Sequence, residues 1–273
     1  MNSHDATALV STVWEESRQL FSHDSGPASG YDWGGDEQAR QNMEEYFRGS
    51  ADRFAMLLSA LSQHLPAESR VLDAGAGHGV LAAVLAKGGF RAYACDIHPG
   101  LPIFDALHIP YQSWHLEADP APYADDYFDA VVLSQTIEHF TYSPRHALEE
   151  IIRITRPGGL ILIDAPNISC FRNISRLLRG KTLHWDFATH YLAHEPSIYK
   201  GIPYYDRHNH EYCKQDLLDI ASFFDLEILA CRYYSSYNRQ KRHWLTIFFS
   251  RIRDTIPHWR KGIFTLLRTH SAG

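Results

Sequence analysis

Three glycines at alternate positions follow an acidic residue in the run from Val71 to Gly79, which reads Val-Leu-Asp-Ala-Gly-Ala-Gly-His-Gly. The glycines are Gly75, Gly77 and Gly79, and the acid is Asp73. Because glycine lacks a Cβ, the backbone can turn sharply there and a ligand can lie directly against it. The carboxylate of Asp73 can hold a cationic ammonium group. The pattern therefore indicates a site for a nucleotide-like cofactor that carries a positive charge.

The spacing of the glycines separates two classes of cofactor. A dinucleotide-binding turn has glycine at its first, third and sixth positions, and counting from Gly75 the sixth position is Val80. The missing glycine argues against a nicotinamide-dependent dehydrogenase. The loop instead resembles the first motif of the class I S-adenosylmethionine-dependent methyltransferases, in which an acid and three alternating glycines follow a hydrophobic strand.

Further residues continue this resemblance on the adenosine side of the expected site. Asp96 ends the next strand about twenty residues after the loop, where a carboxylate accepts hydrogen bonds from the two ribose hydroxyls. Ile97 beside it is assigned to the same site. The resemblance implies that Glu117 accepts from the adenine amine and that the Ala118 N–H meets a ring nitrogen. Asp119 competes with Glu117 for this role.

The run from Ser134 to Phe140, Ser-Gln-Thr-Ile-Glu-His-Phe, resembles the family's Glu-His-hydrophobic signature at a strand-to-helix turn beside the sulfonium. The resemblance implies that Ser134 and Gln135 line the pocket near the methionine group and that Glu138 braces the local backbone. It also places His139 close to the transferred methyl group, where the imidazole can be a base or a structural residue.

Aromatic residues and histidines are frequent in residues 168–213, which are expected to form an inserted lid over the acceptor. The run from Asp206 to Tyr212, followed by a helix at 214–224, is similar to a pattern in bacterial methyltransferases that act on small molecules, glycans and lipid-linked sugars. His208 is the first candidate for the general base and His210 the second, since neutral imidazole accepts a hydroxyl proton near about pH 7. The alternative is that these histidines cap and brace the helix.

His190 and His194 also lie in this segment, four residues apart. On a helix this spacing places both rings on one face and suits a metal ion. The sequence offers no third ligand at a fixed spacing, so it assigns no metal.

The expected elements place these residues on one α/β domain. A strand leads into Asp73, and helical spacing of apolar residues continues through 36–64. Further strands are expected at 91–96, 130–134, 160–165, 226–232 and 263–267, and helices at 6–20, 80–87, 146–155, 214–224 and 238–254. We therefore predict a Rossmann-like, seven-stranded, mostly parallel sheet with an antiparallel last strand, helices on both faces and a lid after strand five. A helical N-terminal cover (1–65) precedes the methyltransferase domain (66–273).

Composition and charge limit the partners of this 273-residue chain, whose formal net charge is -6. Nine Lys or Arg and only one acid occur from Arg232 onward, so the rest of the chain is acidic, which argues against a nucleic-acid partner. The basic helix at 238–254 can contact a membrane surface or pack on the sheet with extended cations, and packing is favoured. The N-terminus has no export signal and the four cysteines are scattered, which favours a cytoplasmic protein. A homodimer is left open.

The resemblance implies an S-adenosylmethionine-dependent methyltransferase. The histidines favour O-methylation of a hydroxyl on a small molecule, natural product or glycan by in-line transfer. N-methylation of a small-molecule amine is the main alternative. A non-catalytic subunit that only binds S-adenosylmethionine is the second.

Overall fold

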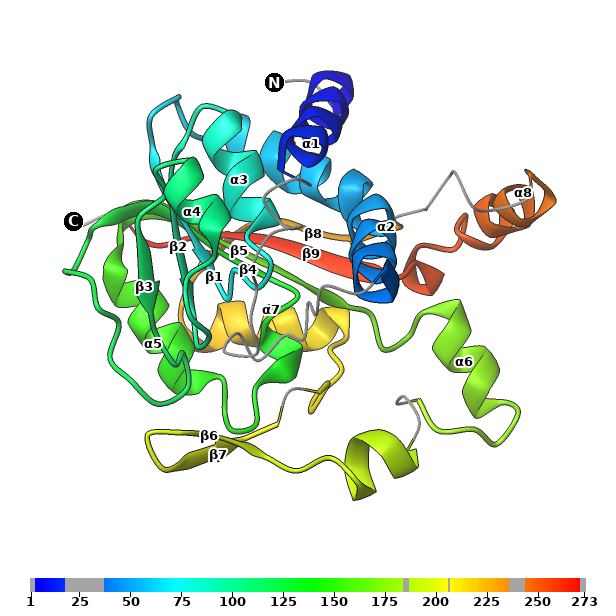
Figure 1. Ribbon diagram of the computed structural model, residues 1–273. Helices are drawn as coiled ribbons and strands as arrows, with labels where there is room; N and C mark the ends of the chain where they lie inside the picture. Colours follow the sequence, from blue (N-terminus) through cyan, green and yellow to red (C-terminus); the bar gives the residue numbers. More distant parts are fainter. Residues whose placement is uncertain (1–2, 18–36, 184–186, 206, 236–243, 271–273) are drawn as a thin grey trace.

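A seven-stranded sheet forms the centre of the protein in the computed structural model, which describes residues 3–17, 37–183, 187–205, 207–235 and 244–270 (Figure 1). The strand order is β3-β2-β1-β4-β5-β9-β8. Neighbouring strands are parallel from β3 to β5, whereas β9 runs antiparallel to both β5 and β8. The predicted fold class is thus confirmed, and the last strand is the antiparallel one. The strands are β1 (Arg70–Ala74), β2 (Arg91–Asp96), β3 (Tyr111–Ser113), β4 (Phe128–Ser134), β5 (Thr155–Pro166), β8 (Glu227–Tyr234) and β9 (Gly262–Arg268).

Both faces of the sheet are buried. Successive side chains of each strand point to opposite sides, so each strand contributes to the packing on both faces. In β4, Ala130 and Val132 join one apolar cluster, whereas Val131 and Leu133 join the other. Helices α1, α2, α3 and α4 contribute to the first cluster, and α5 and α7 to the second. The helices are α1 (Ser3–Ser17), α2 (Glu37–Ser62), α3 (Val80–Lys87), α4 (Pro102–Ala106), α5 (Arg145–Ile154) and α7 (Lys214–Phe223).

The N-terminal helices belong to the same layer as α3. Residues 18–36 lie outside the described part, and the apolar spacing in 36–64 forms one helix, α2. Its Leu57, Leu58 and Leu61 are fully buried in the first cluster. A consequence for the site is that α2 brings a buried cation, Arg53, to the end of the sheet where the glycine loop lies.

The segment 168–213, which is predicted to form the lid, leaves and rejoins the sheet at one point. Asn167 follows β5 and forms an isolated parallel bridge with Tyr212, and the Ile168 N–H donates to the Tyr212 carbonyl oxygen (2.9 Å). Between these residues the chain spreads beyond the sheet, on the lower side of Figure 1. The described elements of the lid are α6 (Phe171–Leu177), a π-helical turn η3 (Ala188–Leu192), and the hairpin of β6 (Ser197–Tyr199) and β7 (Ile202–Tyr204).

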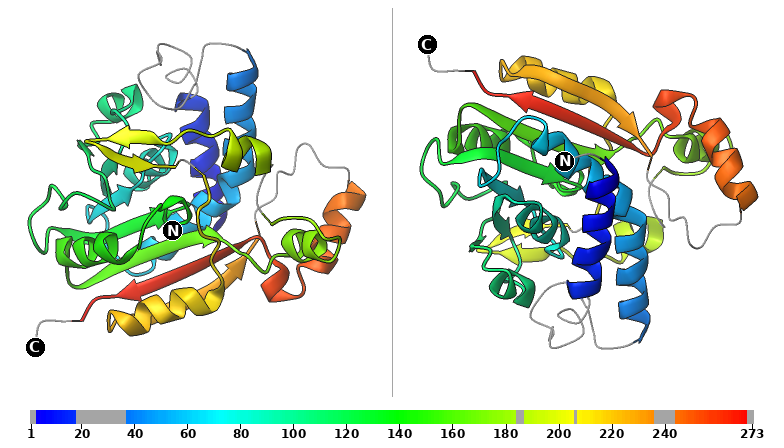
Figure 2. Two further views of the ribbon diagram at one scale, coloured as in Figure 1. Left: turned by 90° about the horizontal axis from the view of Figure 1, so that it is seen from below. Right: turned by 90° about the horizontal axis from the view of Figure 1, so that it is seen from above.

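The basic C-terminal helix does not cover the sheet as predicted. Helix α8 (Trp244–Arg253) lies beyond its edge in all three ribbon views (Figures 1 and 2), and the predicted first turns, 238–243, lie outside the described residues. After it the turn η4 (Pro257–Trp259) leads into β9, and the Trp259 ring packs against Phe171 of α6 at 5.3 Å. None of the helices within the described ranges combines the length and apolar character needed to cross a membrane.

Candidate active site

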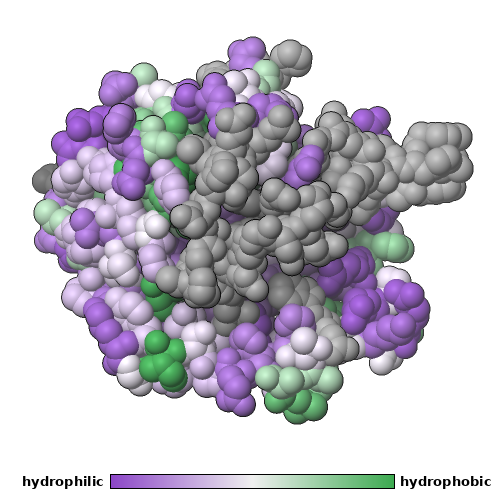
Figure 3. Space-filling model, in the orientation of Figure 1, coloured by the Kyte–Doolittle hydropathy of each residue, from purple (hydrophilic) through white to green (hydrophobic). Residues whose placement is uncertain are grey.

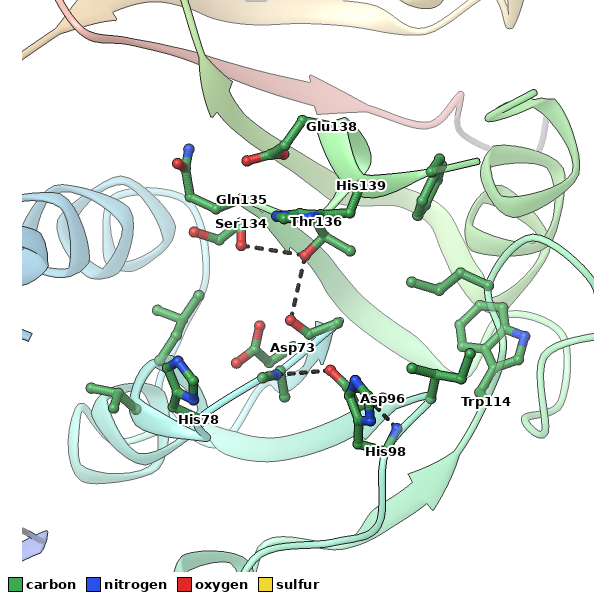
Figure 4. A pocket seen from close by; sticks show the side chains of 18 of the residues that line it. Asp73, His78, Asp96, His98, Trp114, Ser134, Gln135, Thr136, Glu138 and His139 are labelled. Carbon is green, nitrogen blue, oxygen red and sulfur yellow. Dashed lines mark hydrogen bonds between the residues drawn. The ribbon is translucent and has the colours of Figure 1, made fainter. Parts of the chain in front are cut away.

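One cavity of about 580 Å³ lies at the carboxyl ends of β1, β2 and β4, where open α/β sheets bind their ligands (Figure 4). Ten of the residues predicted from the sequence line it: Asp73, Gly75, Gly77, Asp96, Ile97, Glu117, Ser134, Gln135, His139 and His208. The other three predicted residues, Gly79, Ala118 and His210, are not among the described residues on its wall.

The glycine turn explains why two of its glycines line the cavity and one does not. Gly75 has φ of 78°, and a Cβ at this position would overlap the side chain of Thr136. Gly77 has φ of 49° and presents its N–H to the cavity side. Gly79 is required for packing instead, because a Cβ there would come within 2.8 Å of both Ile103 and Phe104 of α4.

Asp96 is held by the turn opposite it. One carboxylate oxygen accepts the Gly77 N–H (2.8 Å), and the other accepts the His98 N–H (3.1 Å). The side chain is nearly buried and lines the cavity (Figure 4). Each oxygen has two lone pairs, so the carboxylate can still accept hydroxyl hydrogens from a ligand.

Asp73 lies deeper, at the end of β1, and is 2% exposed. Its Oδ2 finds no hydrogen-bond partner in the described part of the chain. Burial raises its pKa to about 7, and the nearby charge of Asp96 acts in the same direction. A buried carboxylate with one unsatisfied oxygen is unfavourable, so this position favours either a proton or a cation in the cavity.

A buried ion pair forms the wall between α2 and β5, and the sequence did not indicate it. Arg53 lies 3.6 Å from the Asp164 carboxylate, which also accepts from the Ser134 hydroxyl (2.9 Å) and the Gln135 amide (3.4 Å). Burial raises the pKa of Asp164, and the Arg53 charge opposes this. The two pocket residues predicted at the end of β4 are therefore fixed by a carboxylate at the end of β5.

The groups predicted to bind adenine are occupied by the chain's own hydrogen bonds. The Glu117 carboxylate accepts the N–H groups of Thr141 and Tyr142, and the Ala118 N–H donates to the His115 carbonyl oxygen (3.0 Å). Burial raises the pKa of Glu117. Glu117 thus connects the end of the β3 strand region to the loop before α5, while its side chain still lines the cavity.

Glu138, His139 and His208 all line the cavity and form one cluster. Figure 4 shows Glu138 and His139 across from Asp96. The His139 and His208 rings meet edge to face with centroids 4.9 Å apart. Glu138 is fully buried, and neither of its carboxylate oxygens has a hydrogen-bond partner among the described residues. Burial raises its pKa to about 8. A backbone N–H at Glu138 acts in the opposite direction, and the role of the side chain in bracing the local backbone stays a prediction.

The backbone around Glu138 is held by the returning end of the lid. The Glu138 carbonyl oxygen accepts the N–H groups of Asn209 (2.8 Å) and His210 (3.3 Å), and the Asn209 amide donates to the His139 carbonyl oxygen (2.9 Å). This clamp directs His208 to the cavity, where Glu211 meets its Nδ1 at 3.2 Å. The His210 ring instead packs against Tyr212 at 4.6 Å.

The lid hairpin closes the cavity near the end of β3. Tyr204 lines the cavity, and its ring and that of Tyr199 contact His115 at 5.8 and 5.2 Å. The Tyr199 hydroxyl and the Lys200 ammonium both reach the Asp119 carboxylate, at 3.0 and 2.9 Å. Asp119, the competing candidate for adenine recognition, thus binds the hairpin of β6 and β7 through its carboxylate.

Comparison with known proteins identifies the family. The family model described as "Methyltransferase domain" matches residues 43–228, which is more than half of the chain. The chain belongs to the class I S-adenosylmethionine-dependent methyltransferases. S-adenosylmethionine is the cofactor of that family. The matched range includes every predicted site residue of this methyltransferase.

Individual relatives of the methyltransferase are distant. It is 34% identical to a demethylmenaquinone methyltransferase from Clavibacter sepedonicus over 101 residues, which are 36% of this chain and 41% of that protein. It is 31% identical to a glycine N-methyltransferase from Rattus norvegicus over 157 residues, covering 50% of this chain and 53% of that protein. The methyltransferase thus spans about half or less of the length of these curated relatives.

A solved structure supports the fold over nearly the whole chain. It is the Burkholderia thailandensis 1,6-didemethyltoxoflavin-N1-methyltransferase with bound 1,6-didemethyltoxoflavin and S-adenosylhomocysteine, and the TM-score is 0.53. The match covers 99% of this chain and 92% of that chain at 13% identity. At this identity the likeness shows the fold of the methyltransferase and not its acceptor.

Proposed function

We propose that this methyltransferase transfers the methyl group of S-adenosylmethionine to a hydroxyl oxygen of a small molecule or glycan. The observation that carries the proposal is the cluster of Glu138, His139 and His208 on the cavity wall. These side chains offer a carboxylate and two imidazoles, and Figure 4 shows two of them, Glu138 and His139, across from the carboxylate of Asp96. A hydroxyl acceptor needs such groups because it must lose a proton as it is methylated.

In this proposal the cofactor lies against the glycine turn with its ribose hydroxyls on Asp96 and its ammonium near Asp73. The fixed carboxylate of Asp96 and the unpaired oxygen of Asp73 support these roles. His78 also lines the cavity, and burial lowers its pKa to about 3. A neutral His78 adds no positive charge beside a cationic cofactor, which would otherwise be repelled.

The acceptor then occupies the space between the cofactor and the lid. The hydroxyl oxygen attacks the methyl carbon, the carbon–sulfur bond breaks, and its electron pair stays on sulfur. The hydroxyl proton passes to the cluster, where His208 is the predicted acceptor. The contact between its Nδ1 and Glu211 supports this role, because a carboxylate orients the ring and stabilises an imidazolium.

N-methylation stays the alternative, and the likeness to a glycine N-methyltransferase favours it. A neutral amine attacks without a strong base, so the cluster would then be less important for the rate. A non-catalytic subunit would bind the cofactor and never consume it.

Product analysis separates these functions. The methyltransferase is incubated with S-adenosylmethionine carrying an isotope-labelled methyl group and with fractionated small-molecule extracts. The proposal predicts a labelled methyl ether, a turnover lost in His208→Ala, and cofactor affinity retained in that variant. His64→Ala, which changes an exposed histidine outside the cavity, is the control. A labelled N-methyl product, or full turnover by His208→Ala, would contradict the proposal.

A further inference from the structure

Glu138, His139 and His208 have the arrangement of a metal-binding site. Each offers one ligand atom, and these atoms all lie within 4.8 Å of one another. Two imidazole nitrogens and one carboxylate oxygen suit first-row divalent cations such as Zn²⁺, Fe²⁺ or Mn²⁺. Three protein ligands also leave coordination positions for a substrate, as catalytic metal sites require.

The Glu138 side chain is an independent indication that a ligand is held here. It is 0% exposed, and both of its oxygens are without a hydrogen-bond partner in the described ranges. A buried carboxylate in this condition is costly, and coordination to a cation removes that cost. A side chain that only filled space at this position would be expected to be apolar.

The charges around the cluster also favour a cation. The groups that act on Glu138 electrostatically are Asp164, Glu211 and Arg53, so this region holds three carboxyl groups, counting Glu138 itself, and one guanidinium. Arg53 lies 3.6 Å from Asp164, so its charge is shared with that carboxylate. A divalent cation would balance the remaining negative charge in a region of low dielectric constant.

The backbone holds the three ligands in place before any ion binds. Glu138 and His139 are consecutive in the short turn η2 (Ile137–His139), and the Asn209 clamp fixes the returning chain against both of their carbonyl groups. Glu211 at the Nδ1 of His208 favours the tautomer whose lone pair is on Nε2. A metal-binding histidine characteristically has such a carboxylate on its other nitrogen.

We propose that this methyltransferase binds a divalent transition-metal cation through Glu138, His139 and His208. The cation takes an acceptor that carries a hydroxyl next to a second oxygen, so that both oxygens coordinate it. Bound to the metal, the hydroxyl loses its proton to water near neutral pH, and the oxygen then attacks the methyl carbon as the carbon–sulfur bond breaks. His208 is in this case a metal ligand and not the base. The acceptor class rests on the proposed function, whereas the metal site does not.

The site is tested by metal binding to the full chain after treatment with a chelator. Zn²⁺ is titrated by calorimetry, and Co²⁺ is added separately to record the absorption bands of a coordinated ion. We expect one site, with affinity lowered about tenfold or more in each of Glu138→Gln, His139→Asn and His208→Asn. His64→Ala is the control for binding to surface histidines and keeps the wild-type affinity.

Glu138→Gln preserves the size of a buried side chain, and cofactor affinity and thermal unfolding measured without metal show whether each variant is folded. Equal Zn²⁺ affinity in folded Glu138→Gln and the wild type would overturn the metal site. Undiminished O-methylation by metal-free protein would overturn the metal's role and leave the proposed function intact. If Zn²⁺ binding depends on these residues but the enzyme methylates nitrogen, the metal site stands and the proposed O-methylation is overturned.

Discussion

Replacing Asp73 by asparagine separates the stability of the empty protein from its affinity for the cofactor. The pKa of Asp73 is raised from 3.8 to about 7, so the folded protein binds a proton that the unfolded chain has already released between these values. The stability associated with this proton is present below about pH 4 and is lost as the pH rises to about 7. Asparagine does not ionise, so Asp73→Asn avoids this loss.

The magnitude follows from the shift. About three pKa units correspond to about 4 kcal/mol, and relaxation of the surrounding groups around the ionised carboxylate reduces this, so we expect about 2 kcal/mol. Without cofactor, Asp73→Asn should be more stable than the wild type by this amount at about pH 8, with a melting temperature about 6 °C higher. The difference should disappear as the pH falls to about 4. Asp126→Asn, which changes an exposed carboxylate, should show no such trend.

The same substitution should weaken the cofactor complex. Loss of the charge opposite the ammonium should lower the affinity for S-adenosylmethionine about tenfold or more at about pH 8. The affinity for methylthioadenosine, which lacks the amino acid group, should change little. Calorimetry and thermal unfolding over the pH range measure both effects. Lower stability of Asp73→Asn at about pH 8, or unchanged affinity for S-adenosylmethionine, would refute the reasoning.

Two further predictions concern the glycine turn and the basic C-terminal segment. Gly75→Ala should weaken S-adenosylmethionine binding and cost about 2 kcal/mol of stability, because its Cβ overlaps Thr136 and its φ is positive. Urea unfolding measures the cost, and an unchanged midpoint would contradict the expected overlap. Membrane contact through the basic segment 238–254 is the second: Arg251 is exposed beside Ile252, so vesicles of anionic lipid should bind the protein and Arg251→Glu should weaken this about tenfold. Equal sedimentation with neutral vesicles would argue against it.

The surface drawn in Figure 3 is relevant to the membrane prediction. Figure 3 shows the face of the molecule drawn in Figure 1. The described residues on this face are mainly hydrophilic, and the hydrophobic ones form small separate groups. The membrane prediction for α8 rests instead on the basic residues of its last turn, Arg251 and Arg253. This is why the prediction is made for anionic vesicles.

The sequence predicted the fold, and it also predicted that the glycine turn and Asp96 belong to one site, because both depend on local patterns. The glycine turn and Asp96 are such patterns, since each is one strand end followed by one turn. The short strand β3 and helix α4 were not predicted. Two of the three β3 residues are exposed and α4 has only five residues, so neither has a clear hydrophobic period.

The contacts between distant segments of the cavity wall could not be predicted in the same way. Arg53 reaches Asp164 from a helix more than a hundred residues away in the sequence, and no local pattern indicates that pairing. Nor does the order of His208 and His210 show which ring faces the cavity, because that depends on the clamp made by Asn209. The metal candidates show the same limit, since the cluster joins neighbours in one turn to His208 across the fold.

Cofactor binding by Asp96→Ala is the most direct test of the account. The wild type should bind S-adenosylmethionine in calorimetry and should not bind reduced nicotinamide dinucleotide. Asp96→Ala should bind S-adenosylmethionine about tenfold or more weakly, because the ribose loses its acceptor. Equal affinity of Asp96→Ala and the wild type, or binding of the dinucleotide in this cavity, would contradict the proposed site.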